Sequence, residues 1–112
     1  MKSEPWQKAY AILDWRAIQN RKRNVIYFGL NETKEHFMLK ANTCYDLLKE
    51  GKEFICEAIF KNNSGRADIF VISQDGVYAI EIVHTEDISK SGKEKYPCPV
   101  VFKYTKEGNQ TP

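Results

Sequence analysis

The chain has 112 residues, of which 42% are hydrophobic and 29% charged, and its formal net charge is +2. This length suits one domain with a real core. The small net charge excludes a general polycation, so any affinity for nucleic acid must come from a local basic patch. No apolar run approaches a membrane span and the first ten residues lack the apolar core of a secretory signal, which predicts a cytoplasmic protein. We expect an extension over 1–30, a core over 31–105 and a loose tail over 106–112.

The three cysteines, Cys44, Cys56 and Cys98, predict buried free thiols. Their odd number and wide spacing argue against a disulfide framework or a structural zinc site. A nucleophilic pair of a cysteine with His36 or His84 stays open, although nothing local supports it.

The N-terminal segment predicts a helix from a Ser3 cap to about Asn20, with Pro5 in its first turn. Apolar residues recur there at helical spacing: Trp6, Ala9, Tyr10, Leu13 and Ala17. The densest basic cluster follows, comprising Arg16, Arg21, Lys22 and Arg23. It is either a patch that contacts phosphates, with Trp15 and Tyr27 as stacking surface, or a solvated helix end.

Residues 25–28 predict a short edge strand or a buried extended connection. A second helix then begins at an Asn31 or Thr33 cap and ends at Gly51. Its expected buried stripe comprises Phe37, Ala41, Cys44, Tyr45 and Leu48. His36 and Lys40, four residues apart, share one face of this helix.

The C-terminal half predicts strands. Residues 53–60 carry apolar side chains on both faces, as a central strand would, with one face formed by Phe54, Cys56, Ala58 and Phe60. After a turn at 61–65, a hairpin follows, with its turn at Gln74-Asp75-Gly76. A surface helix over 86–96 and a last strand over 100–104 complete an αβββαβ core. We therefore expect an α/β (α+β) fold, in which a mixed sheet is flanked by helices and the last two strands run parallel.

Two acids stand out in the hairpin because they lie among apolar residues. Asp68 sits near the start of its first strand and Glu81 near the end of its second. Antiparallel pairing brings the two carboxylates to one place on the sheet, where they form an oxygen site for a hard divalent cation. The alternative is two edge acids that are solvated or paired with Arg66.

The order of elements and the position of the two acids resemble the PD-(D/E)XK, or restriction-endonuclease-like, superfamily. The resemblance covers about Thr33 to Tyr104, in the segments EHFMLKANTCYDLLKEG, EFICEAIF, GRADIFVIS, AIEIVHTEDISK and YPCPVVFKY. It implies a phosphodiesterase site in which Asp68 and Glu81 hold Mg²⁺ or Mn²⁺. The backbone carbonyl of Ile82 would be a further ligand, and Glu35 or Glu57 a third carboxylate.

The chain departs from the family pattern at two positions. Ala67 replaces the proline that precedes the first acid, and Val83 replaces the lysine of the E-x-K element. That lysine stabilises developing negative charge, which valine does not do. Either a lysine from elsewhere takes its place, with Lys40, Lys61 and Lys90 as candidates, or His84 substitutes, or the site is inactive and kept for binding.

The resemblance implies a small metal-dependent endonuclease that acts on DNA, with RNA not excluded and a homodimer as an expected assembly. The nucleic-acid contacts would come from Arg16, Arg21, Lys22, Arg23 and Arg66. The alternative is an inactive module of the same fold that binds nucleic acid or a protein. A third interpretation is an unrelated α/β interaction domain with incidental acids.

Overall fold

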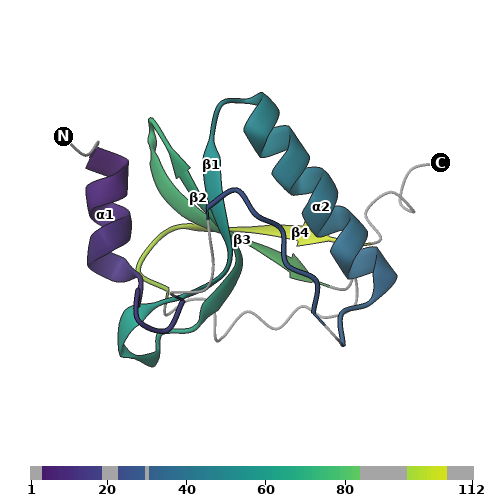
Figure 1. Cartoon of the computed structure of the whole chain (residues 1–112), viewed down its shortest axis with the longest axis horizontal. Coiled ribbons are helices and arrows are strands. Elements are labelled where there is room, and N and C mark those ends of the chain that lie inside the picture. Colours follow the sequence, from purple (N-terminus) through teal and green to yellow (C-terminus); the bar gives the residue numbers. More distant parts are fainter. Residues whose placement is uncertain (1–3, 19–22, 30, 84–95, 106–112) are drawn as a thin grey trace.

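A four-stranded mixed sheet forms the centre of the computed structural model, which describes residues 4–18, 23–29, 31–83 and 96–105 (Figure 1). Its strands lie side by side in chain order: β1 (Glu53–Ile59), β2 (Arg66–Ser73), β3 (Gly76–Val83) and β4 (Val100–Tyr104). The first three form an antiparallel meander, and β4 runs parallel to β3. The predicted α+β class, the four core strands and the parallel last pair are confirmed.

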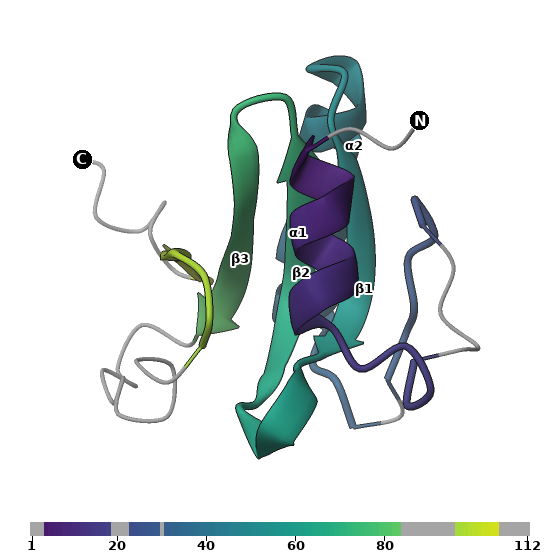
Figure 2. The ribbon, with the colours of Figure 1, turned by 90° about the vertical axis from the view of Figure 1, so that its left-hand side faces the viewer.

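Two helices cover the two faces of this sheet, α1 (Glu4–Ile12) and α2 (Lys34–Lys49) (Figure 2). Each helix packs on its own hydrophobic core. The α1 side buries twelve residues: Ala9, Leu13, Ile18, Ile55, Ala58, Phe60, Ala67, Phe70, Ile72, Val77, Ala79 and Tyr96. The α2 side buries eight: Cys44, Leu47, Phe54, Cys56, Ile69, Val71, Ile80 and Ile82. The sheet thus has two buried faces, which explains why its strands are apolar on both sides. Among the described residues no helix is both long and apolar enough to span a membrane.

The first helix is shorter than predicted, because it ends at Ile12 rather than near Asn20. The chain turns there onto the edge of β1: Leu13 bridges Phe60, and the Asp14 amide donates to the Ile59 carbonyl at 2.8 Å. These bonds hold the chain against the strand instead of in a further helical turn. Ser3, the predicted cap, lies outside the described residues.

The second helix begins and ends as predicted, since the Thr33 hydroxyl accepts the His36 amide and Gly51 follows the end with φ +81°. Its buried face is different from the predicted stripe. Tyr45 and Leu48 are 62% and 46% exposed, and Phe37 and Ala41 are half-buried. Cys44 is buried as predicted, and the other residues that face the sheet are Lys40, Thr43 and Leu47. Two polar residues on the buried face hid the true orientation from a hydrophobic pattern.

Two further predictions are corrected. Residues 25–28 form neither a strand nor a buried connection, since Val25, Ile26 and Phe28 are 38%, 38% and 64% exposed. β1 is an edge strand rather than a central one. Its edge is covered locally by Asn24, which exchanges two hydrogen bonds with Phe54. The predicted helix over 86–96 lies outside the described residues except for Tyr96.

β1 changes faces at Glu57, which is a correction to the single face predicted for 54–60. Phe54 and Cys56 pack under α2, whereas Ala58 packs on the α1 side of the sheet. Glu57 has φ +55°, a left-handed backbone conformation that is strained for a residue other than glycine. The pairing of β1 with β2 is interrupted at the same place, between Cys56–Ile69 and Ala58–Ala67. Glu57 and Asp68 occupy this gap.

Candidate functional site

Three acids lie in one row across three neighbouring strands. Asp68 falls opposite Glu57 where the β1–β2 pairing is interrupted, and opposite Glu81 just beyond the last β2–β3 pair, Ile69–Ile80. The row therefore marks the level at which the β1–β2 pairing is interrupted and the β2–β3 pairing ends. Backbone irregularities of this kind are enriched at functional sites because they redirect side chains.

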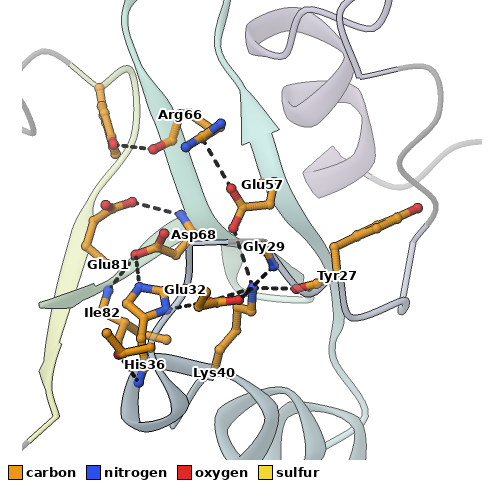
Figure 3. Close-up of polar contacts among 12 residues, drawn as sticks. Tyr27, Gly29, Glu32, His36, Lys40, Glu57, Arg66, Asp68, Glu81 and Ile82 are labelled. Atoms are coloured by element: carbon orange, nitrogen blue, oxygen red, sulfur yellow. Dashed lines mark hydrogen bonds and ion pairs between the residues drawn. The ribbon is translucent and has the colours of Figure 1, made fainter. Parts of the chain in front are cut away.

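Asp68 and Glu81 replace the missing strand pairing with their side chains (Figure 3). The Asp68 carboxylate accepts the Ile82 amide at 2.8 Å, and the Glu81 carboxylate accepts the Asp68 amide at 3.0 Å. Glu81 is 3% exposed, whereas the Asp68 side chain is 20% exposed. The two acids therefore lie at one level of neighbouring strands, each bound to the backbone of the other strand, and Asp68 is the more accessible of the two.

His36 connects Asp68 to α2. Its Nε2 atom lies 3.6 Å from the Asp68 carboxylate, and its Nδ1 atom contacts the carboxylate of Glu32. The neighbouring Asp68 carboxylate raises the pKa of His36 above its ordinary value, although burial opposes this, and Glu32 adds to the increase. Burial alone would raise the pKa of Glu32, but the Gly29 amide, Lys40 and His36 together lower it. The three side chains thus form a charged chain from the loop before α2 to β2.

Lys40 is buried beneath this chain, with 1% of its side chain exposed. Its ammonium donates to the Tyr27 carbonyl and lies 2.9 Å from Glu32 and 3.6 Å from Glu57. Since an ammonium has three donors, these partners account for its hydrogen-bonding capacity. Lys40 therefore binds the loop of Tyr27–Glu32 to α2 and β1, and it does not present its charge to the surface.

A hollow of about 720 Å³ opens beside these residues. Arg66, whose side chain is 62% exposed, lies at this hollow and pairs with Glu57 at 3.2 Å. The hollow is lined by both charged and aromatic side chains and by backbone of the loop before α2: Tyr27, Phe28, Gly29, Asn31, Glu32, Thr33, His36, Glu57, Arg66, Asp68 and Thr105. Three carboxylates, from Glu32, Glu57 and Asp68, thus line the hollow, and Lys40 and Arg66 pair with two of them, Glu32 and Glu57.

The other predicted site residues lie apart from this group. Glu35 is exposed and projects about 100° around α2 from His36. Lys61 is exposed in the turn Lys61–Asn63. Ile82 contributes its amide to Asp68, and its side chain is buried in the core under α2.

The predicted basic patch is described only in part. Arg16 is exposed, and Arg23 pairs with Glu53 at 3.0 Å and lies over the Trp6 ring. Arg21 and Lys22, like Lys90 and His84, lie outside the described residues.

Sequence reasoning missed Glu32 and the roles of its two partners on α2. The missed signal was the spacing Glu32, His36, Lys40, in which each residue follows the last by four. Residues four apart on a helix face lie above one another, so an acid, a histidine and a lysine at this spacing predict a polar ladder. Glu32 precedes the Thr33 cap and therefore lies in the loop, so its place in the ladder could not be predicted without the loop conformation.

The carboxylate oxygens are suitable ligands for a hard cation, but they do not form a complete set of ligands. Among residues 4–18, 23–29, 31–83 and 96–105, no three His, Cys, Asp or Glu side chains form a group that could hold a metal ion alone. Mg²⁺ is commonly held by one or two carboxylates, with water and substrate phosphate as its other ligands. Asp68 fits this limited role, because it lines the hollow and a carboxylate that accepts one amide keeps further acceptor capacity, whereas Glu81 is 3% exposed and also interacts with Tyr96.

The chain was compared with models of protein families, with curated proteins and with solved structures. None of the three comparisons finds a match.

Proposed function

We propose that this protein is a small, divalent-metal-dependent endonuclease-like protein that acts on phosphodiester bonds of DNA. The observation that carries the proposal is the row of Glu57, Asp68 and Glu81 across β1, β2 and β3. The row lies at an interruption of the sheet, and Asp68 opens onto the hollow. Although these acids bind strand amides and neighbouring cations, carboxylates on adjacent strands also repel one another, and a bound cation would relieve that repulsion.

The arrangement of the strands supports a restriction-endonuclease-like core. A three-stranded meander is followed by a fourth strand parallel to the third, and the helix before the meander covers one face of the sheet. The first acid lies near the start of β2 and the second near the end of β3. These features agree with what the sequence resemblance implies, with α2 in the place of the first core helix, while the second core helix expected over 86–96 lies outside the described residues except for Tyr96.

The charge at the hollow supports a role for a cation. The three carboxylates of Glu32, Glu57 and Asp68 exceed the two cations Lys40 and Arg66, so the site is negative while His36 is neutral. A negative site repels a phosphodiester unless a cation lies between them. Bound Mg²⁺ or Mn²⁺ would neutralise charge on the scissile phosphate and acidify the attacking water.

The surrounding residues hold this site in shape. His36 fixes the Asp68 carboxylate from α2, and the backbone amide of Ile82 fixes it from β3. Lys40 holds Glu32 and Glu57, which form one wall of the hollow. Arg66 is the exposed cation next to the row, so it is the residue placed to contact a phosphate.

The test is cleavage of supercoiled and branched DNA with Mn²⁺, combined with Mn²⁺ binding followed by electron paramagnetic resonance. Asp68→Asn and Glu81→Gln should each reduce cleavage by about 100-fold or more and weaken Mn²⁺ binding. Asp75→Asn is the matched control, because Asp75 is exposed in the hairpin turn. Unchanged cutting by either site variant, or a wild type that binds no Mn²⁺, would refute the proposal.

A second candidate function is a module of the same fold that binds nucleic acid or a protein without cleaving. Two observations favour it: Val83 occupies the position of the family's lysine, and Lys40 is enclosed by its own partners. This module would bind Mn²⁺ and cut nothing. Its affinity for DNA should fall steeply as the salt concentration rises, and the substitution Arg16→Ala should weaken binding further. An affinity that does not depend on salt would argue for a protein partner instead.

A further inference from the structure

The outer face of α2 carries apolar side chains that the described part of the chain leaves exposed. Met38, Tyr45 and Leu48 are 46%, 62% and 46% exposed, and Ala41 between them is half-buried. Single exposed apolar residues are common on proteins, but these four follow one another at intervals of three, four and three. That is the spacing of the a and d positions of a coiled coil.

The geometry of the helix places this stripe away from the sheet. At about 100° per residue, the four side chains centre roughly 140° around the helix from Lys40, Thr43 and Leu47, which face the sheet. Tyr45 and Leu48, which an amphipathic interpretation of the sequence assigns to the core, therefore belong to a second apolar surface.

We propose that this stripe is the interface of a homodimer in which two copies of α2 pack antiparallel. The stripe is self-complementary about a twofold axis near its middle. Met38 of one copy meets Leu48 of the other, and Ala41 meets Tyr45, so the smallest side chain lies opposite the largest. This complementarity of size is the arrangement that close helix packing requires.

The charges beside the stripe select a second copy as the partner, in the antiparallel orientation. Glu35, Asn42 and Lys49 are all exposed and lie along one flank, seven residues apart. In an antiparallel pair this flank faces its own counterpart, so Glu35 of each copy meets Lys49 of the other. The two Asn42 side chains meet near the axis. Lys49 already lies over the Tyr45 ring, at 5.9 Å from its centre, and is held close to the stripe.

A parallel pair would lose both contacts, because Glu35 and Lys49 are about 21 Å apart along the helix. The charged flank thus determines orientation and partner, while the apolar stripe supplies most of the affinity. One helix per copy makes a small interface, so we expect a reversible dimer with a Kd on the order of 10 µM.

The experiment is sedimentation equilibrium of the full chain from about 1 to 300 µM, a range that brackets the expected Kd. The wild type should change from the 13.0 kDa monomer to twice that mass. Leu48→Glu and Tyr45→Glu should each raise the Kd by about tenfold or more, with an unchanged circular dichroism spectrum because both residues are exposed in the monomer. Asp46→Lys, on the same helix but off the stripe, should leave the Kd unchanged.

A charge exchange tests the orientation. Glu35→Lys and Lys49→Glu should each weaken the homodimer, because each brings like charges together. A mixture of the two variants should form a heterodimer at least as tightly as the wild type self-associates, and the double variant should recover the wild-type Kd. A monomer at all concentrations would overturn the proposal. So would a dimer unaffected by Leu48→Glu, or one in which the mixed variants do not recover affinity.

Discussion

Replacement of Lys40 by methionine should remove a large part of the protein's stability. Methionine retains the length and apolar stem of lysine but removes the ammonium that contacts Tyr27, Glu32 and Glu57. Lys40 and Glu32 are 1% and 8% exposed, so the variant would leave a buried carboxylate without its main partner. Removal of one member of a buried ion pair costs about 3–5 kcal/mol. We expect about 3 kcal/mol, because Glu32 keeps the Gly29 amide and His36.

The measurement is urea unfolding followed by the fluorescence of Trp6 and Trp15. With a dependence of about 1–3 kcal/mol per molar urea, the midpoint should fall by about 1–3 M. The double variant with Glu32→Gln removes both charges and should be less destabilised than the sum of the two single variants, by about 1 kcal/mol or more. Lys61→Met is the control, because Lys61 is exposed. If Lys40→Met and Lys61→Met unfolded at the same urea concentration, the structural role proposed for Lys40 would be refuted.

Two more predictions concern pH and backbone geometry. Because the folded state raises the pKa of His36, chiefly through Asp68, its stabilising contribution should be complete below the unfolded value of about 6.5 and lost as pH rises through the folded value. With EDTA present, His36→Gln should therefore lower the free energy of unfolding more at about pH 5.5 than at about pH 9. An equal loss at both pH values would contradict this predicted pH dependence. Gly65→Ala should cost about 2–3 kcal/mol, since Gly65 has φ +124° and a Cβ there would lie 2.4 Å from the Tyr96 ring. Gly76→Ala, with φ +137° and no atom within 4 Å of its Cβ, is the control for backbone strain alone, and equal losses in thermal melts would rule out the contact with the ring.

The parts of the fold that could be predicted are those with local signals. The Thr33 cap and Gly51 mark the ends of α2, and the short turn before Gly76 determines which residues of β2 and β3 face each other. Once that register is known, the meeting of Asp68 with Glu81 follows from the period of a strand.

The parts that could not be predicted depend on contacts between distant segments. α1 ends early because Leu13 and Asp14 bind β1, about 45 residues further along the chain. α2 turns Lys40 rather than Tyr45 inward, because Glu32, Glu57 and the Tyr27 carbonyl together satisfy a buried ammonium. A hydrophobic pattern assigns lysine to the surface unless these partners are known.

The side-chain bonds that join β2 to β3 at the row of acids also give the site an internal reporter. The amide protons of Asp68 and Ile82 are held by the carboxylates of Glu81 and Asp68 rather than by backbone carbonyls. A ligand that draws either carboxylate away would release the corresponding proton to solvent. Most ligands slow the hydrogen exchange of a protein, because they stabilise its folded state. At these two amides, binding to the acids should instead accelerate exchange, so their exchange rates would distinguish occupation of the site from general stabilisation.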